Sequence, residues 1–310
     1  MPSLLALDDP KLVLLAALVV ITIAFCVFWF MAARRSRAAG PGAPGPWHMA
    51  IGFITNFFDT LGISSFATTT TFFRMPRAGN IGAPKGKQGL VDDLVIPGTL
   101  NVGHFLPTVA QALIYTVIVE VEFATLVLLI VAAVAGSWIG AAIVADMPRR
   151  AIQKGMGVAL LIASVLVALA AMGRIPGGGE ALGLTGGKLI LAVGINFVLG
   201  ALMTLGIGLY APCMIMISLL GMNPTAAFPV MMGSCAFLMP TAGIQFINKG
   251  KYDLRAALGL ALGGVPAVLI AAYIVRSLPL LYVRWLVVAV VLYTAVSLLR
   301  SAASEPRSRS

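Results

Sequence analysis

The chain has 310 residues, of which 60% are hydrophobic and only 10% are charged, and its mean hydropathy is +1.00. Soluble domains carry about 25% charged residues, so the composition excludes a soluble domain with a charged surface and indicates an integral membrane protein. The net charge is +10, but the basic residues are scattered between apolar stretches and form no common face. This pattern argues against a nucleic-acid partner and fits basic loops on the cytoplasmic side of a bilayer.

The first apolar stretch, residues 12–32, is long enough for the roughly 20 residues that a membrane span requires. Two acidic residues precede it and three arginines follow it within five positions. This charge order favours a retained anchor with its N-terminus outside over a cleaved signal peptide. A linker rich in Gly, Pro and Ala follows over residues 39–46.

The next stretch, 49–73, carries several polar residues and has basic residues on both flanks. We expect two half-helices that enter the membrane and return to the same side. Residues 95–119 then cross outward through Pro97 and Pro107, 123–145 cross back, and 155–172 cross out again to a glycine-rich loop. Gly136 and Gly140 give a GxxxG spacing, which is typical of close helix contacts.

The second half of the chain repeats this order, with a broken pair over 189–220 followed by spans at 226–247, 254–275 and 279–299. Three pairs of short sequences align: Thr60–Ile63 with Thr204–Ile207, Pro107-Thr108 with Pro240-Thr241, and Met147-Pro148 with Leu278-Pro279. If the first half begins inside and the second outside, the halves are inverted copies, as in many secondary transporters. If both broken stretches are instead full spans, the orientation of the later helices changes.

The predicted fold is an all-α polytopic membrane protein with two inverted structural repeats, broken or re-entrant helices and one extra N-terminal transmembrane helix. That helix and its linker occupy 1–46, the first repeat 47–173, an extracytoplasmic loop 174–188, the second repeat 189–300 and a cytoplasmic tail 301–310.

Asp59 is the only acid deep inside a hydrophobic stretch. A charge at such a depth costs roughly 3 kcal/mol on insertion scales, so it is by default functional, as a proton carrier, an ion ligand or the partner of a buried base. A second interpretation is that Asp59 caps a helix where the stretch breaks. The two interpretations are compatible, and the sequence does not separate them.

Helix breaks at Gly62, Gly206 and Gly208 would expose backbone N–H groups, which form natural anion sites at helix N-termini. Nearby hydroxyl and thiol side chains could add hydrogen bonds to a small oxyanion, although small residues at helix contacts give the same pattern. Pro107 and Pro240 each free a backbone carbonyl one turn earlier. His104 is a candidate proton relay, or a histidine satisfied by bonds between helices, and Asn196 has the same two interpretations.

The candidate substrate-binding residues are Asn56, Asp59, Thr60, Gly62, Ser64, Ser65, Thr68, Asn101, His104, Gln111, Thr204, Gly206, Gly208, Tyr210, Cys213, Ser234, Thr241 and Gln245, with Asp59 and His104 as candidates for proton coupling.

Motifs of enzymes and of cofactor or metal sites are missing from the sequence. It has no HExxH or GxSxG motif, and Asp59 has no second acid in a matching span. Cys26, Cys213 and Cys235 form no CxxC pair, so they suggest buried small hydrophobes and neither a disulfide framework nor a metal site. We therefore expect no enzymatic activity, no catalytic residues, no cofactor and no bound metal.

The segments Gly52–Ile63 and Gly200–Gly208, together with Met147-Pro148-Arg149-Arg150, resemble the sulfite exporter TauE/SafE family of transporters. The resemblance covers residues 49–299 and leaves out the first helix. It implies a secondary carrier without a prosthetic group that exports a small anion, such as sulfite, an organosulfonate or a related carboxylate, across the cell inner membrane. The sequence departs from the glycine-rich form of the motif at Ser64-Ser65.

The first functional hypothesis is therefore an alternating-access carrier for a small anion, with the bilayer and the substrate as its partners. A passive anion channel with the same pore and a non-transporting membrane assembly partner are the alternatives. The sequence leaves a homodimer open, and it does not identify the substrate, the coupling ion or the direction of transport.

Overall fold

The computed structural model describes residues 10–37, 43–75, 89–174, 178–206, 208–274 and 280–304. The α-helices of these ranges are α1 Pro10–Arg37, α2 Pro46–Thr60, α3 Ser65–Arg74, α4 Ile96–Gly103, α5 Phe105–Ile118, α6 Phe123–Val144, α7 Arg149–Ala171, α8 Gly186–Met203, α9 Tyr210–Leu219, α10 Ala227–Asn248, α11 Leu254–Ile274 and α12 Leu280–Ser304. A 3-10 turn, Pro224–Ala226, precedes α10. Within the described ranges, β-structure is limited to an isolated bridge between Ala181 and Met222.

Several of these helices have the length and composition of membrane spans. In the described part of the chain, α1, α6, α8, α10 and α11 are long and apolar enough to cross a bilayer, and α5 is a shorter apolar helix. The flank of α1 that faces away from the other helices exposes Val20, Ile23 and Phe30, as expected for a surface solvated by lipid. The prediction of an all-α membrane protein is confirmed at this level.

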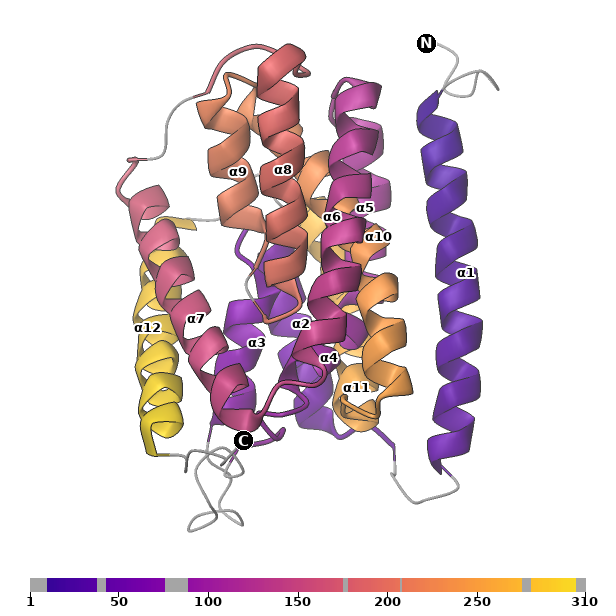
Figure 1. The fold of residues 1–310 in the computed structure, drawn as a ribbon, viewed down its shortest axis with the longest axis vertical. Helices are drawn as coiled ribbons and strands as arrows, with labels where there is room; N and C mark the ends of the chain where they lie inside the picture. Colours follow the sequence, from indigo (N-terminus) through magenta and orange to yellow (C-terminus); the bar gives the residue numbers. More distant parts are fainter. Residues whose placement is uncertain are drawn as a thin grey trace.

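Two helix pairs turn back inside the molecule (Figure 1). Helix α2 rises from one end, the chain turns at residues 61–64, and α3 runs back to the end from which α2 came. Helix α8 starts at the opposite end, and after residues 204–209 α9 returns to that opposite end. The two pairs therefore approach each other from opposite ends.

The helices of the two halves exchange partners. Helix α2 packs mainly on α11, α8 packs mainly on α6, and α7 lies beside α12, with α10 against α5 and α6 at the centre. Glycines allow the α2–α11 and α6–α8 contacts to be close. A Cβ atom added at Gly263 would lie 1.9 Å from the Met49 carbonyl oxygen, and one added at Gly136 would lie 1.9 Å from the Phe197 carbonyl oxygen. The predicted role of Gly136 and Gly140 in a close helix contact is confirmed, since both meet α8.

Helix boundaries differ from the sequence prediction in two places. The predicted span 95–119 is two helices, α4 and α5, which separate at His104. Pro107 has no N–H to donate to the carbonyl one turn earlier, which explains a break at that point. The span predicted at 155–172 starts six residues earlier, at Arg149, because the Pro148 carbonyl already accepts the helical bonds of Ala151 and Ile152. The repeated Leu278-Pro279 pair and Ile207 lie outside the described residues.

A buried ionic cluster joins α3 to the body of the protein. Arg74, the last residue of α3, pairs with Asp93, whose side chain is 1% exposed. Gln153 of α7 donates to the same Asp93 oxygen over 2.9 Å, and Arg149 pairs with Asp92 over 2.8 Å. Because these charges lie largely out of water, each needs its partner. The cluster fixes the last residue of α3 against α7 and the segment that precedes α4.

Candidate functional site

The two copies of the Thr-Leu-Gly sequence form the same backbone turn. Gly62 has φ +86° and Gly206 has φ +95°, both in the left-handed region that favours glycine. The Gly62 N–H donates to the Asp59 carbonyl over 2.9 Å, and the Gly206 N–H donates to the Met203 carbonyl over 2.9 Å. A glycine in this conformation directly after a helix is a common helix terminator. The repeated sequence therefore ends α2 and α8 in the same way.

The segments that follow these turns touch each other. Gly208 lies so close to Ser64 that a Cβ atom added to it would be 1.9 Å from the Ser64 Oγ and 2.6 Å from the Ser64 Cβ. Tyr210, the first residue of α9, reaches across to Asp59 at the end of α2, with 3.1 Å between the hydroxyl and Oδ2. The site expected between the two broken stretches is thus a place where they are in direct contact.

Asp59 is held by three donors from three different segments. Its Oδ1 accepts the Ser65 N–H over 2.5 Å, and its Oδ2 accepts from Gln111 Nε2 over 3.0 Å and from the Tyr210 hydroxyl. Asp59 is 2% exposed. Because Ser65 begins α3, the carboxylate occupies the N-terminus of that helix, as in the capping interpretation. The position that was expected to hold a substrate anion at α3 is therefore filled by the protein's own anion.

Gln111 and Tyr210 complete a closed network around that carboxylate. The Tyr210 hydroxyl also lies 2.8 Å from Gln111 Oε1, and Gln111 Nε2 also donates to Thr60 Oγ1 over 3.0 Å. A tyrosine hydroxyl carries one proton, so the Tyr210 hydroxyl donates either to Asp59 or to Gln111 at any moment. The network therefore has two proton arrangements without movement of a heavy atom. At its edge, Tyr115 donates to the Thr60 carbonyl over 2.8 Å and stacks on Phe228.

His104 lies at the break between α4 and α5 and bridges α2 and α3. Its Nδ1 is 3.0 Å from Asn56 Oδ1, and its Nε2 is 2.9 Å from Thr69 Oγ1. Asn56 uses its Nδ2 to donate to the Gly52 carbonyl, so its Oδ1 accepts from His104. We therefore assign the proton to Nδ1, and Nε2 accepts from the Thr69 hydroxyl. This geometry satisfies a neutral imidazole completely, as in the interpretation of a histidine bonded between helices.

The N-terminus of α9 differs from that of α3. Leu209 occupies its N-cap position, and no side chain caps the helix. Tyr210 and Ala211 supply backbone N–H groups at the first two positions, while Pro212 has none to supply. Ser64 is adjacent through its contact with Gly208. Of the two inner helix N-termini, α9 is thus the one without an anionic side chain on it.

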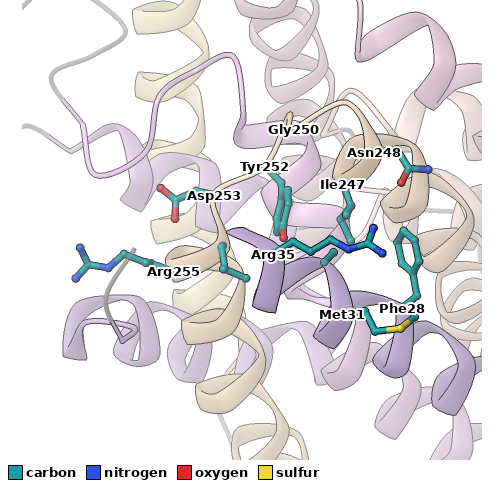
Figure 2. A pocket seen from close by; sticks show the side chains of 11 residues that line it. Phe28, Met31, Arg35, Ile247, Asn248, Gly250, Tyr252, Asp253 and Arg255 are labelled. Carbon is teal, nitrogen blue, oxygen red and sulfur yellow. The ribbon is translucent and has the colours of Figure 1, made fainter. Parts of the chain in front are cut away.

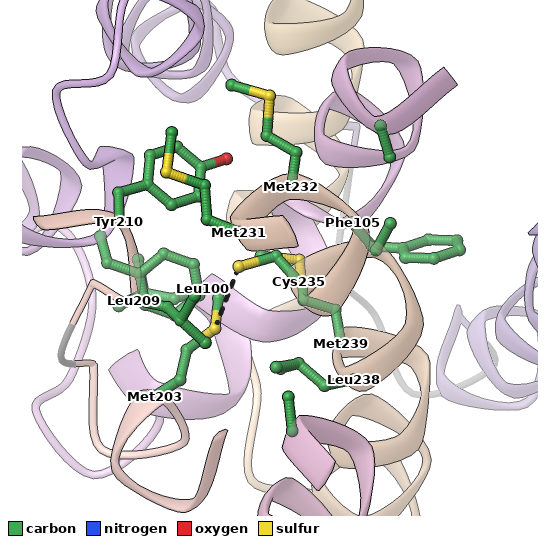
Figure 3. Close-up of a cluster of buried hydrophobic side chains, with 14 of the residues drawn as sticks. Leu100, Phe105, Met203, Leu209, Tyr210, Met231, Met232, Cys235, Leu238 and Met239 are labelled. Carbon is green, nitrogen blue, oxygen red and sulfur yellow. Dashed lines mark hydrogen bonds between the residues drawn. The ribbon is translucent and has the colours of Figure 1, made fainter. Parts of the chain in front are cut away.

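The two turns are also chemically different at the residue before the shared sequence, which is Asp59 in the first copy and Met203 in the second. Met203 Sδ lies 3.4 Å from Cys235 Sγ in a buried cluster with Met231, Met239 and Leu100 (Figure 3). Cys213 and Cys235 are free and buried, and Cys26 is half-buried. The described residues contain no group of His, Cys, Asp and Glu that could hold a metal ion. One half therefore presents a carboxylate and the other presents apolar sulfur.

Several other predicted residues bond mainly to nearby backbone. Asn101 donates to the Pro97 carbonyl, Thr204 to Ala201, Thr241 to Phe237, and Thr68 to Ser65. Two others bond between helices: Ser234 accepts a bond from Asn196 over 3.1 Å, and Gln245 donates to the Trp138 carbonyl over 2.6 Å. The structure brings together Asp59, Thr60, Ser64, Ser65, Gln111, Gly208 and Tyr210, and it does not join Gln245 or Thr241 to that group by a hydrogen bond.

Tyr115 takes part in the site but was not among the predicted site residues. Tyr115 lies one helical turn beyond Gln111, which is a signal that the sequence offered. The partnership of Thr69 with His104 joins residues 35 positions apart, and no local pattern points to it. Comparisons of the chain with protein-family models, curated proteins and solved structures found no match.

Proposed function

We propose that the protein is a secondary transporter that carries a small anion across a membrane by alternating access. The observation that carries the proposal is the contact between the segments that follow the two Thr-Leu-Gly turns, which belong to helix pairs from opposite ends of the molecule. Interrupted helices in corresponding positions of two halves mark the substrate site in many transporters. The resemblance to the sulfite exporter TauE/SafE family favours a small sulfur oxyanion, an organosulfonate or a carboxylate as the substrate, and the cell inner membrane as the location.

In this proposal the two halves are inverted repeats, and the two helix pairs are re-entrant. The reciprocal packing supports this: α2 of the first half packs on α11 of the second, and α8 of the second packs on α6 of the first. A two-fold axis in the membrane plane would generate such an exchange, because it superposes each half on the other and so turns the α2–α11 pair into the α8–α6 pair. The same axis reverses the direction of each equivalent helix. Irregular backbone at the two turns is then buried in protein, as a bilayer requires.

The anion is proposed to bind between the inner N-termini of α3 and α9. Backbone N–H groups of Tyr210 and Ala211 and the Ser64 hydroxyl would donate to it. At α3, the substrate would compete with the Asp59 carboxylate for the Ser65 N–H. The contacts describe a closed site, so the two turns must separate for a substrate to enter.

This competition suggests how protons would be coupled to transport. An ionised Asp59 occupies the N-terminus of α3 and repels a second anion. When Asp59 binds a proton, it loses its charge, and the Ser65 N–H becomes available to the substrate. A proton and an anion would then bind together and travel in the same direction. His104, whose two nitrogens are satisfied by Asn56 and Thr69, has a positioning role in this scheme.

Uptake by proteoliposomes tests the proposal. Vesicles containing the purified protein should take up labelled sulfite, thiosulfate or a short sulfonate with a saturable rate that increases with an inward proton gradient. D59N retains an oxygen for the Ser65 N–H but cannot ionise, so its uptake should no longer respond to the gradient. D146N is the matched control, since Asp146 is an exposed acid that pairs with Lys249 at the end of α6, away from the two turns.

A folded protein that takes up none of these anions would contradict the transport proposal. Rates that do not saturate with concentration would favour a channel. A D59N variant with the wild-type response to the proton gradient would exclude Asp59 from coupling while leaving the carrier proposal in place.

A further inference from the structure

A cavity of about 550 Å³ lies between the end of α1 and the connection from α10 to α11. Helix α1 stands at the edge of the molecule (Figure 1), and its buried face packs on α10 and α5, with the rings of Phe25 and Phe105 4.8 Å apart. The cavity opens beside the C-terminal part of α1, and its lining includes no residue of the candidate site.

The ends of three apolar helices place this cavity at a membrane boundary. The membrane-length segment of α1 ends at Arg35, that of α10 ends at Asn248, and that of α11 begins at Leu254. All three residues line the cavity. Because each helix changes from apolar to polar at these positions, the cavity lies where hydrocarbon meets the headgroup layer.

The lining of the cavity has an apolar part and a polar part, as expected at a membrane boundary. Phe28 and Met31 of α1 and Ile247 of α10 form an apolar part, and Figure 2 shows the Arg35 side chain lying across the space between Tyr252 and Phe28. Arg255 points away in the same view, and its Nε donates to the Ala43 carbonyl over 3.2 Å. The guanidinium of Arg35 is therefore the cation that faces the cavity among its described lining residues.

Two polar groups of the cavity, on Arg35 and Tyr252, lack a partner among the described residues. No described residue forms an ion pair with Arg35, and the nearby Asp253 uses its Oδ1 to accept the Ala256 N–H over 2.9 Å at the start of α11. The Tyr252 hydroxyl is buried beside the Trp29 indole and makes no hydrogen bond of normal geometry with a described residue. Burial raises the pKa of Tyr252, so its hydroxyl stays protonated and can donate. The Tyr252 hydroxyl is thus a buried polar atom without a partner, whereas the Arg35 guanidinium is exposed and can bind an anion in the cavity.

We propose that this cavity binds an anionic phospholipid, whose phosphate is held by Arg35 and Tyr252 and whose acyl chains lie along Phe28 and Met31. Arginine binds phosphate through two parallel hydrogen bonds, and basic pockets between membrane helices at the headgroup level recognise anionic lipids. A bound lipid would fill the space between α1 and the α10–α11 connection and thereby fasten α1 to the rest of the protein. This inference does not depend on the transport proposal.

The test measures lipid-dependent thermal stability of the full chain, purified and delipidated in a neutral detergent. Phosphatidylglycerol, phosphatidylcholine and soluble glycerol 3-phosphate are titrated separately, and bound phosphatidylglycerol is counted by native mass spectrometry. We expect phosphatidylglycerol to raise the unfolding temperature more than phosphatidylcholine does. R35Q and Y252F should weaken the apparent affinity for phosphatidylglycerol, by about tenfold or more for R35Q, since a hydrogen bond to a charged group contributes that much. R300Q is the matched control, because Arg300 is exposed on α12 and does not line the cavity.

Equal effects of phosphatidylglycerol and phosphatidylcholine on the wild-type protein would overturn the proposal, even if R35Q failed to fold. So would an unchanged affinity in both R35Q and Y252F, or an R300Q loss as large as that of R35Q. Stabilisation by glycerol 3-phosphate as strong as that by the lipid would replace the lipid with a free phosphate ester.

Discussion

The contact between Gly208 and Ser64 gives the most direct test of the central geometry. In G208A, the new methyl group would lie 1.9 Å from the Ser64 Oγ and 2.6 Å from the Ser64 Cβ. The hydroxyl oxygen can rotate away about χ1, but the Cβ is fixed to the backbone. The two segments must therefore separate by several tenths of an ångström before the methyl group fits.

Overpacking of this kind costs about 1–3 kcal/mol of unfolding free energy. The structure also indicates which changes at Ser64 should restore the lost stability. S64A removes only the oxygen and leaves the contact of 2.6 Å, whereas S64G removes both atoms and leaves the Ser64 Cα as the nearest atom, at 4.0 Å. We expect G208A to be the least stable variant, G208A/S64A to recover partly, and G208A/S64G to recover most of the loss.

The assay is thermal or denaturant unfolding of the detergent-purified protein for the wild type, each single variant and each double variant. Residues in contact usually show coupling energies of about 0.5–3 kcal/mol, and a favourable coupling for G208A with S64G is expected here. If the effects of G208A and S64G simply add, the two segments are not in contact, and the reasoning about the central site is wrong. Anion uptake measured on the same variants should follow this order if the contact belongs to the transport site.

Two further predictions concern packing away from the turns. R74M should lower the unfolding free energy by about 3–5 kcal/mol, because it leaves the buried Asp93 without its guanidinium partner. The double variant R74M/D93L should be clearly more stable than R74M in the same unfolding assay. If the R74M/D93L loss equals the sum of the two single losses, the two charges do not depend on each other. G263A should lose about 1–3 kcal/mol, since its methyl group would meet the Met49 carbonyl oxygen at 1.9 Å. G194A, with nothing within 4 Å of the added atom, should instead gain up to about 1 kcal/mol of helix stability, and equal effects of the two glycine variants would contradict the close α2–α11 contact.

Local features of the sequence predicted the main elements well. The apolar stretches gave most of the helix positions, because a run of apolar residues of that length has few alternatives to a buried or lipid-facing helix. The repeated Thr-Leu-Gly sequence gave both turns, because a left-handed residue after a helix strongly favours glycine. The start of α7 was placed too late because Arg149 and Arg150 look like a loop, although helical bonding has already begun at Pro148.

The site was less predictable, because its partners come from distant parts of the chain. Asp59 was a clear candidate as a lone acid in an apolar stretch, and the cap on α3 was foreseen as one of two roles. Its bond to Tyr210 joins residues 151 positions apart, and the pairing of His104 with Thr69 joins different helices. No spacing rule for a helix or a turn extends over such separations.

The sequence by itself determined that this protein lies in a membrane, where most of its helices run, and which two glycines end α2 and α8. These are properties of single segments, which follow from side-chain hydropathy and the allowed backbone angles. Only the tertiary structure decided that the segments after the two glycines touch and that the Asp59 carboxylate covers the start of α3 while no side chain caps α9. It also decided that Arg35 faces an open cavity and has no ion-pair partner among the described residues. Those outcomes depend on which helices pack together, and that choice is made by close contacts at positions such as Gly263 and Gly208, summed over the whole chain.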